Sequence, residues 1–252
     1  MDRERAVAVA GTKAVARGVA VAMLAALASC GRRPDPLPGF PRVMLWAWER
    51  PERLMFLDST AAGVAFLART VSWSDTGIVS QPRYQPLEVP PGTAMMAVIR
   101  MESHSARFPD PDALAAQIVE VAALPRVKAI QIDFDARRSE RDWYAALLGH
   151  VRQRLPPSVL LSMTALASWC LGDPWIRGLP VNDAVPMLFR RGAGEPRHVT
   201  DFSLEVCRSS LGISTDEAPL SLPHGRRLFI FHPHPWTREA YHDAMQGARR
   251  WR

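Results

Sequence analysis

Two aspartates, Asp133 and Asp135, close an alternating run of residues at 127–135 and are the side chains best placed for chemistry. In a β-strand, residues two apart share a face, so both carboxyl groups point the same way as Gln131. The opposite face of this strand is apolar and consists of Ile130, Ile132 and Phe134. Carboxyl groups held about 6 to 7 Å apart along a strand repel each other. One of them is therefore expected to keep its proton, as the acid of a glycoside hydrolase must.

A parallel strand in an α/β barrel explains this alternation, because its apolar face meets the helical shell and its other face points into the barrel. A helix is predicted to follow, starting at Ser139 with an S-x-x-D pattern that ends on Asp142 and stopping at Pro156-Pro157. The next predicted strand covers 158–167. Residues 127–167 thus form one expected βαβ unit.

The rest of the chain supplies further elements of the same kind. The other strands are expected at 43–48, 64–73, 93–103, 184–189, 211–214 and 227–231. Helices are expected at 53–62, 109–123 and 240–251, and a proline-rich loop at 74–91. These elements predict the α/β class and a single compact, glycosidase-like (β/α)8 TIM barrel over residues 43–252.

The first 30 residues are predicted to be a lipoprotein signal peptide. Basic residues precede an apolar stretch at 18–28, and Leu27-Ala28-Ser29-Cys30 follows. This ending resembles the lipobox of bacterial lipoproteins, in which the cysteine, here Cys30, is lipidated. The alternatives are an ordinary signal peptide or a short membrane anchor, but spanning a bilayer takes roughly 20 apolar residues. Residues 31–42, rich in proline, predict an extended tether, so the expected location is the periplasmic face of the cell envelope.

The charge and the cysteines limit the other partners. The net charge is +6, but no stretch combines clustered basic residues with aromatic ones, so we expect no nucleic-acid partner. No Gly-rich phosphate loop, dinucleotide fingerprint or G-x-S-x-G elbow occurs, so we expect no cofactor. We also expect the protein to be a monomer. In an oxidising compartment Cys170 and Cys207 are expected to form a disulfide, the alternative being two buried thiols.

Further candidates stand near the ends of predicted strands. Trp46 and Trp48 share one face of the first strand and are either core residues or a platform for stacking sugars. Arg100 and Glu102 share a face of the third strand. Glu102 is either a third catalytic carboxylate facing Asp133 or the ion-pair partner of Arg100. Glu217 is a further candidate partner for the aspartates.

Arginine and histidine residues complete the list of candidates. Arg190 follows the sixth strand and either binds a carboxylate or sugar hydroxyl or forms a structural ion pair. His232 and His234 lie two apart after the eighth strand and suggest a metal-dependent alternative with Asp133 or Asp135, although their flanking prolines equally indicate a rigid loop and we expect no bound metal. The expected substrate-binding residues are Trp46, Trp48, Gln131, Trp169, Arg190 and His232.

Three stretches, 131–136, 164–170 and 179–190, resemble an uncharacterised bacterial family of secreted or lipid-anchored proteins, domain of unknown function 3142, which has been linked to barrel glycosidases. The resemblance spans about residues 43–236 and implies a fold better than a reaction.

More distantly, the strand around Asp133 is similar to the chitinase-like signature Asp-x-x-Asp-x-Asp-x-Glu. Asp133 and Asp135 match its second and third aspartates, whereas Ile130 replaces the first and Arg137 stands in place of the acid glutamate. The general acid is therefore unassigned. We expect a hydrolase acting on a polysaccharide or oligosaccharide, and the alternative is a glycan-binding lipoprotein with a degenerate glycosidase barrel.

Overall fold

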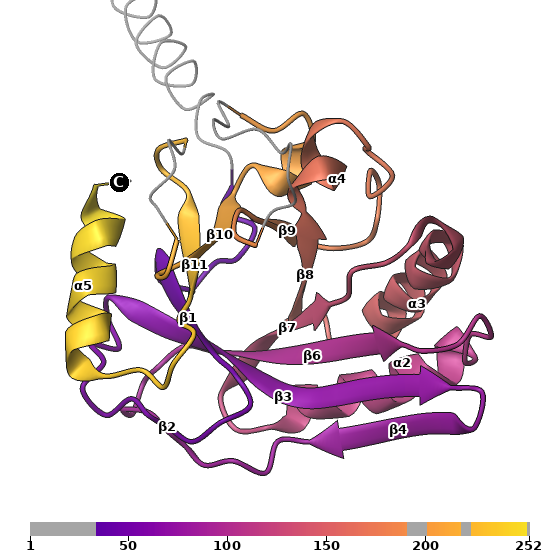
Figure 1. Ribbon diagram of the computed structural model, residues 1–252, viewed down its shortest axis with the longest axis horizontal. Coiled ribbons are helices and arrows are strands. Elements are labelled where there is room, and N and C mark those ends of the chain that lie inside the picture. The colour runs from indigo at the N-terminus through magenta and orange to yellow at the C-terminus, as the bar shows by residue number, and fades with distance from the viewer. Residues whose placement is uncertain (1–33, 191–200, 218–222, 251–252) are drawn as a thin grey trace, which may run out of the picture. The chain divides into compact units, whose positions relative to one another are not determined.

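The run around Asp133 forms strand β7 (Val127–Asp133), which lies between the parallel strands β6 (Met95–Ser103) and β8 (Leu160–Leu166). In this computed structural model, which describes residues 34–190, 201–217 and 223–250, the parallel pairing continues around a closed circuit (Figure 1). The other parallel strands are β1 (Val43–Ala47), β3 (Ala62–Ser74), β9 (Asp183–Met187), β10 (Ser210–Ser214) and β11 (Arg227–Phe231). Because β1 pairs with both β3 and β11, eight parallel strands close into a barrel, and the predicted fold class is confirmed.

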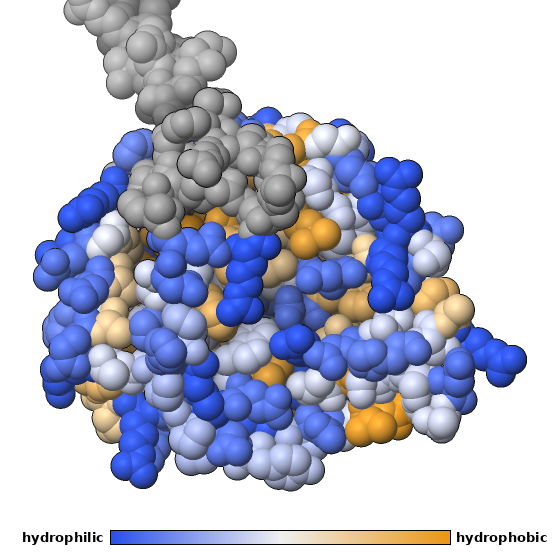
Figure 2. Space-filling view, viewed as in Figure 1, coloured by the Kyte–Doolittle hydropathy of each residue, from blue (hydrophilic) through white to orange (hydrophobic). Residues whose placement is uncertain are grey.

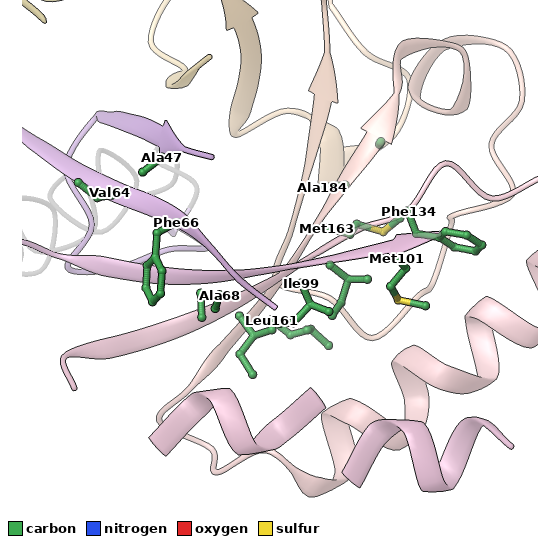
Figure 3. Close-up of a cluster of buried hydrophobic side chains, with 14 of the residues drawn as sticks. Ala47, Val64, Phe66, Ala68, Ile99, Met101, Phe134, Leu161, Met163 and Ala184 are labelled. Atoms are coloured by element: carbon green, nitrogen blue, oxygen red, sulfur yellow. The ribbon is translucent and has the colours of Figure 1, made fainter. Parts of the chain in front are cut away.

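The outward face of the barrel packs under helices, as the alternation in β7 predicts. Ile130 and Ile132 are fully buried in a cluster with residues of α2 (Pro111–Val119) and α3 (Arg141–Arg154). Figure 3 shows members of this cluster, including Ile99 and Leu161, lying between the strands and helices. Each fully buried aliphatic side chain contributes about 1.5–3 kcal/mol, so this outer layer holds the wall of the barrel in place.

Side chains from the segment that precedes β1 fill part of the barrel interior. Leu37 and Phe40 are buried in a second apolar cluster that contains inward-facing residues of the strands. The guanidinium of Arg227, itself 1% exposed, donates hydrogen bonds to the carbonyl oxygens of Pro41 at 2.9 Å and of Leu37 and Phe40 at 3.2 Å. The predicted tether covers residues 31–42, and its second half is part of the packed core. Leu37 and Phe40, which lie between its prolines, fill the barrel interior.

A helix predicted at 53–62 is absent. The chain there forms a short strand, β2 (Glu52–Arg53), followed by turns. The carboxylate of Asp58 accepts hydrogen bonds from the backbone N–H and the hydroxyl of Thr60, at 2.9 and 2.7 Å. Such a local side-chain bond offers the backbone an alternative to the helix.

The predicted loop at 74–91 contains two strands. β4 (Gly77–Pro82) pairs antiparallel with β3, and β5 (Leu87–Glu88) pairs with β2. β4 extends the sheet beyond the barrel, and its Ile78 and Val79 are exposed. Figure 2 shows an apolar patch over β4 on a face that is otherwise mostly hydrophilic.

The start of α3 also differs from the prediction. A 3-10 turn, η2 (Arg138–Glu140), precedes the helix, and the carboxylate of Glu140 accepts the backbone N–H of Arg137 at 2.6 Å. The predicted cap, Ser139, lies inside this turn, and the side chain of Glu140 caps the turn that leads into α3. The remaining helical elements are η1 (Glu120–Ala123), α4 (Ala167–Leu171), η3 (Glu205–Cys207) and α5 (Arg238–Arg249).

A disulfide between Cys170 and Cys207 joins α4 to η3. Within the described part of the chain, no helix combines the length and apolar character needed to cross a bilayer. The predicted signal peptide at 1–30, with Cys30, lies outside the described residues.

Candidate active site

A pocket of about 520 Å³ opens where the carboxyl ends of the barrel strands meet. Its lining comes from the ends of six strands and the segments that follow them. β6 and β7 supply a side with carboxyl groups, while β1, β9 and β11 supply a side with aromatic rings. The three predicted catalytic residues, Glu102, Asp133 and Asp135, all line this pocket.

Asp133 is the last residue of β7 and is half-buried at the pocket. Thr164, on β8, donates a hydrogen bond from its hydroxyl to Oδ1 of Asp133 at 2.7 Å. Burial raises the pKa of Asp133 from 3.8 to about 6, opposed by the Thr164 hydrogen bond and assisted by the charge of Asp135. A carboxyl group with this pKa can exchange a proton close to neutral pH, as acid–base catalysis requires.

Asp135 lies two residues beyond the strand and is exposed at the mouth. Partial loss of hydration in the pocket raises the pKa of Asp135, and the positive charge of Arg100 opposes that rise. The two aspartates therefore differ in exposure and in partners although one strand end presents both. Such a difference is how a pair of carboxyl groups takes up separate acid and base roles.

Arg100 and Glu102, on the neighbouring strand β6, form an ion pair with Nε and Oε1 2.8 Å apart. The guanidinium of Arg100 also lies 5.8 Å from the ring centre of Trp48, and Arg100 is paired with Asp133 in the β6–β7 register. The predicted ion pair of Glu102 with Arg100 is thus present, and Glu102 also lines the pocket, where its catalytic role stays a prediction. Arg100 thus links the carboxyl side of the pocket to its aromatic side.

A buried chain of hydrogen bonds forms the floor. The indole Nε1 of Trp46 donates to Oε1 of Gln131 at 2.9 Å, and Nε2 of Gln131 donates to the hydroxyl of Ser162 at 3.2 Å. Trp46 lines the pocket although it is only 3% exposed, whereas Gln131 is fully buried and is not part of the pocket lining. Gln131 therefore supports the site from below instead of contacting a ligand as predicted, and Trp46 is chiefly a core residue.

Trp48, Phe231 and Phe189 form the aromatic wall of the pocket. Phe189 and Phe231 stack with ring centres 5.7 Å apart, and Trp48 meets Phe231 edge-on at 6.3 Å. The two phenylalanines were not predicted. Phe231 is two residues beyond the inward-facing Phe229, the same spacing that relates Trp48 to Trp46, so paired inward aromatics at strand ends were the missed signal.

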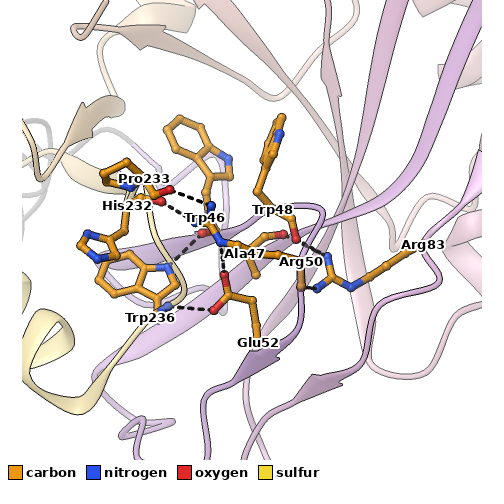
Figure 4. A network of polar contacts seen from close by, with 9 residues as sticks. All are labelled: Trp46, Ala47, Trp48, Arg50, Glu52, Arg83, His232, Pro233 and Trp236. Atoms are coloured by element: carbon orange, nitrogen blue, oxygen red, sulfur yellow. Dashed lines mark hydrogen bonds and ion pairs between the residues drawn. The ribbon is translucent and has the colours of Figure 1, made fainter.

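A polar network beneath Trp48 fixes the wall to the fold (Figure 4). Glu52 is fully buried, and its carboxylate accepts hydrogen bonds from Nε of Arg50 and from the backbone N–H of Trp236, both at 2.9 Å. The guanidinium of Arg50 donates to the carbonyl oxygens of His232 and Pro233 at 2.5 and 3.0 Å. The segment after β1 is thereby tied to the segment after β11.

Arg83 completes this network from the loop after β4. Its guanidinium donates to the carbonyl oxygens of Trp48 and Arg50, each at 2.5 Å. Burial lowers the pKa of Arg83, and the negative charge of Glu52 opposes the change. The backbone that carries Trp48 is therefore fixed from both sides, which keeps its ring in place at the pocket.

Comparison with known proteins gives limited matches. No family model matches this chain, and no curated protein sequence matches it. A similar solved structure is the spore cortex-lytic enzyme SleL of Bacillus cereus, with 15% identity and a TM-score of 0.42 over 70% of this chain and 52% of that one. Another is the chitinase domain of the spore coat protein CotE of Clostridium difficile, with 14% identity and a TM-score of 0.43 over 76% and 61%. The chain thus spans about half to three fifths of these two structures.

The remaining predicted residues fall into two groups. Arg190 lines the pocket, with its guanidinium 5.2 Å from the ring centre of Phe231. Trp169 does not line it, because the ring is 2% exposed and packs edge-on against Trp175 at 5.0 Å in the outer core. Glu217 accepts the backbone N–H of Arg190 at 2.5 Å and is not part of the pocket lining.

His232 lies outside the pocket lining as well. Its Nδ1 is hydrogen-bonded to the hydroxyl of Thr215 at 2.6 Å, and burial together with His234 lowers the pKa of His232. The two imidazole rings are 6.0 Å apart. Across residues 34–190, 201–217 and 223–250, no group of three or more His, Cys, Asp or Glu side chains is arranged to hold a metal ion, so the structure does not bring either aspartate to the histidines.

Proposed function

We propose that this protein is a cell-envelope hydrolase that cleaves glycosidic bonds of a polysaccharide at the barrel mouth. The observation that carries the proposal is the pair Asp133 and Asp135, presented by one strand end in different environments and facing an aromatic wall. Asp133, with a pKa of about 6, is assigned the role of proton donor to the leaving oxygen. Asp135 is assigned the negative charge that stabilises the oxocarbenium-like transition state.

Turnover by the purified protein tests this assignment directly. Reducing ends released from a panel of bacterial polysaccharides are compared for the parent and for Asp133→Asn and Asp135→Asn. We expect each substitution to lower the rate roughly 100-fold or more, because each removes a group needed in the transition state. Asp142→Asn, an exposed change on α3, is the matched control and should keep the parental rate. Unchanged release by both active-site variants would contradict the assignment.

A second function, glycan binding without cleavage, is favoured by a specific observation. Both glutamates in the pocket lining are engaged by the protein itself: Glu102 pairs with Arg100, and Glu140 holds the N–H of Arg137. If the aspartates do not transfer protons, no free glutamate among the described lining residues replaces them. Binding of a polysaccharide by the parent and by Asp133→Asn, without release of reducing ends by either, would establish this function.

The cellular location is proposed from the sequence. Residues 1–30 are proposed to direct export, with Cys30 carrying the lipid, in keeping with the resemblance to the lipoprotein family of unknown function. The disulfide between Cys170 and Cys207 supports an oxidising compartment. Membrane fractionation of cells producing the parent and Cys30→Ser tests the anchor. We expect only the parent in the membrane fraction, and equal distribution of the two proteins would contradict lipidation.

A further inference from the structure

The positive charges of the pocket are not all used by the protein. Three arginines line it, namely Arg100, Arg137 and Arg190. Arg100 is paired with Glu102. Among the described residues, neither Arg137 nor Arg190 lies within ion-pair distance of a carboxylate. Two cations at the pocket thus have no contacting carboxylate in the described part of the fold, and the charge of Arg190 acts on Asp216 only beyond ion-pair distance.

Arg190 is held in this position at a conformational cost. Its φ is +52°, in the left-handed region that a residue with a side chain seldom adopts. Glu217 fixes its backbone N–H, and its guanidinium lies over the ring of Phe231 in the aromatic wall. Arg126 shares the positive φ, at 66°, but its guanidinium bonds the carbonyl oxygen of Pro90 at 3.0 Å.

Arg137 is presented in a similar way. Its backbone N–H is bound by the carboxylate of Glu140, as that of Arg190 is bound by Glu217. In both cases a glutamate secures the main chain of an arginine that lines the pocket. The two arginines follow β7 and β9, which flank β8 in the barrel, so they border one sector of the mouth.

We propose that Arg137 and Arg190 bind carboxylate groups of the substrate, so that the polysaccharide contains uronic acids. This inference rests on the proposed function, since it names the substrate class of the same pocket. The planar donors of a guanidinium match a carboxylate in bidentate geometry. Asp135 and Glu102, which line the same pocket, repel an anion, so the carboxylate of an acidic sugar is favoured at the two arginines and its ring at the aromatic wall.

Paired substrates that differ only in charge test the proposal. Uronic-acid polysaccharides are compared with the same polymers after reduction of their carboxyl groups to alcohols, using the full chain. We expect the acidic form to bind about tenfold more tightly, through charge-assisted hydrogen bonds, and to lose this advantage as salt is raised. Arg190→Gln and Arg137→Gln should each remove most of the preference for the acidic form. Arg190→Lys should retain part of it.

Arg126→Gln is the matched control, because it removes an exposed arginine with the same backbone conformation outside the pocket lining. It should bind both forms as the parent does, and melting curves verify that each variant is folded. Equal binding of acidic and reduced polymers by the parent overturns the proposal and leaves the hydrolase assignment standing if either is cleaved. Binding of the acidic form without cleavage supports the proposal and overturns the hydrolase assignment. Absence of binding to either form overturns both.

Discussion

At the scale of single residues, Asp133 links the proposed function to stability. Its pKa is about 6 in the folded protein against 3.8 for an ordinary aspartate, so the folded state binds this proton more tightly than the unfolded chain. Stability is therefore lost as the pH rises from 3.8 to about 6. Above pH 6 the cost of the buried charge is fully present. At 1.36 kcal/mol for each pKa unit, that cost is about 3 kcal/mol at most.

Asp133→Asn should remove this cost. We expect the free energy of unfolding to increase by about 1–3 kcal/mol at pH 7.5 and to change little near pH 4, where the aspartate of the parent is protonated. Urea unfolding at the two pH values measures the difference. Asp142→Asn provides the comparison, and equal destabilisation of Asp133→Asn at both pH values would contradict the burial argument.

Thr164 influences the pH at which Asp133 loses its proton. Its hydrogen bond lowers the pKa of Asp133, so Thr164→Val should raise that pKa further and move the alkaline limb of the pH–rate profile upward. Thr164→Ser keeps the hydroxyl and should retain the parental profile. The measurement is kcat/KM against pH on the cleaved polysaccharide. A profile that Thr164→Val leaves in place would show that Asp133 does not supply the titrating proton.

The shared direction of Asp133 and Asp135 follows from the period of two in their strand, which the sequence displays. The depth of a side chain along the barrel axis does not, because it depends on the register between strands. Trp46 and Trp48 share a face and both line the pocket, yet Trp46 is buried in its floor and Trp48 is partly exposed. Trp169 was misplaced since it lies in α4, where the strand period no longer applies.

At the scale of elements, all eight barrel strands were predictable because each carries an apolar run. Local hydrogen bonds decided the places where the prediction is wrong, as Asp58 does in the missing helix at 53–62. The hairpin of β3 and β4 was also missed, although Gly77, with φ of 136°, marks its turn. The two β-branched residues directly after this glycine, Ile78 and Val79, were the available signal.

Close contact between strands gives a prediction at this scale. A Cβ on Gly212, in β10, would lie 2.9 Å from the indole of Trp46 and 3.4 Å from Cα of Met187. Trp46 cannot move away without breaking its hydrogen bond to Gln131. Gly212→Ala should therefore destabilise the protein by about 1–3 kcal/mol through overpacking, as measured by thermal unfolding.

Gly149, in α3, provides the control. No atom lies within 4 Å of a Cβ built there, so Gly149→Ala should stabilise the helix by about 0.5–1 kcal/mol. Similar melting temperatures for Gly212→Ala and Gly149→Ala would contradict the claim that Trp46 leaves no room for a side chain at position 212.

At the scale of the whole molecule, the disulfide between Cys170 and Cys207 connects positions 37 residues apart. Replacing both cysteines by serine should cost about 2–4 kcal/mol, mainly because the unfolded chain gains freedom. Thermal unfolding with and without reductant measures this cost. The parent should lose stability in reductant and the double variant should be insensitive to it. Insensitivity of the parent would show that the bond does not stabilise the fold.

The closure of the barrel determines when the pocket can exist. Its carboxyl side is built from consecutive strands, β6 to β8, but its aromatic side joins β1 to β11, with contacts between residues up to 190 positions apart. Such distant pairings form slowly. During synthesis the carboxyl side, formed by β6 to β8, can assemble first. The edges of β1 and β10 stay unpaired until β11 is made. The protein is thus most exposed to aggregation, and its pocket is incomplete, in the interval before β11 pairs with β1.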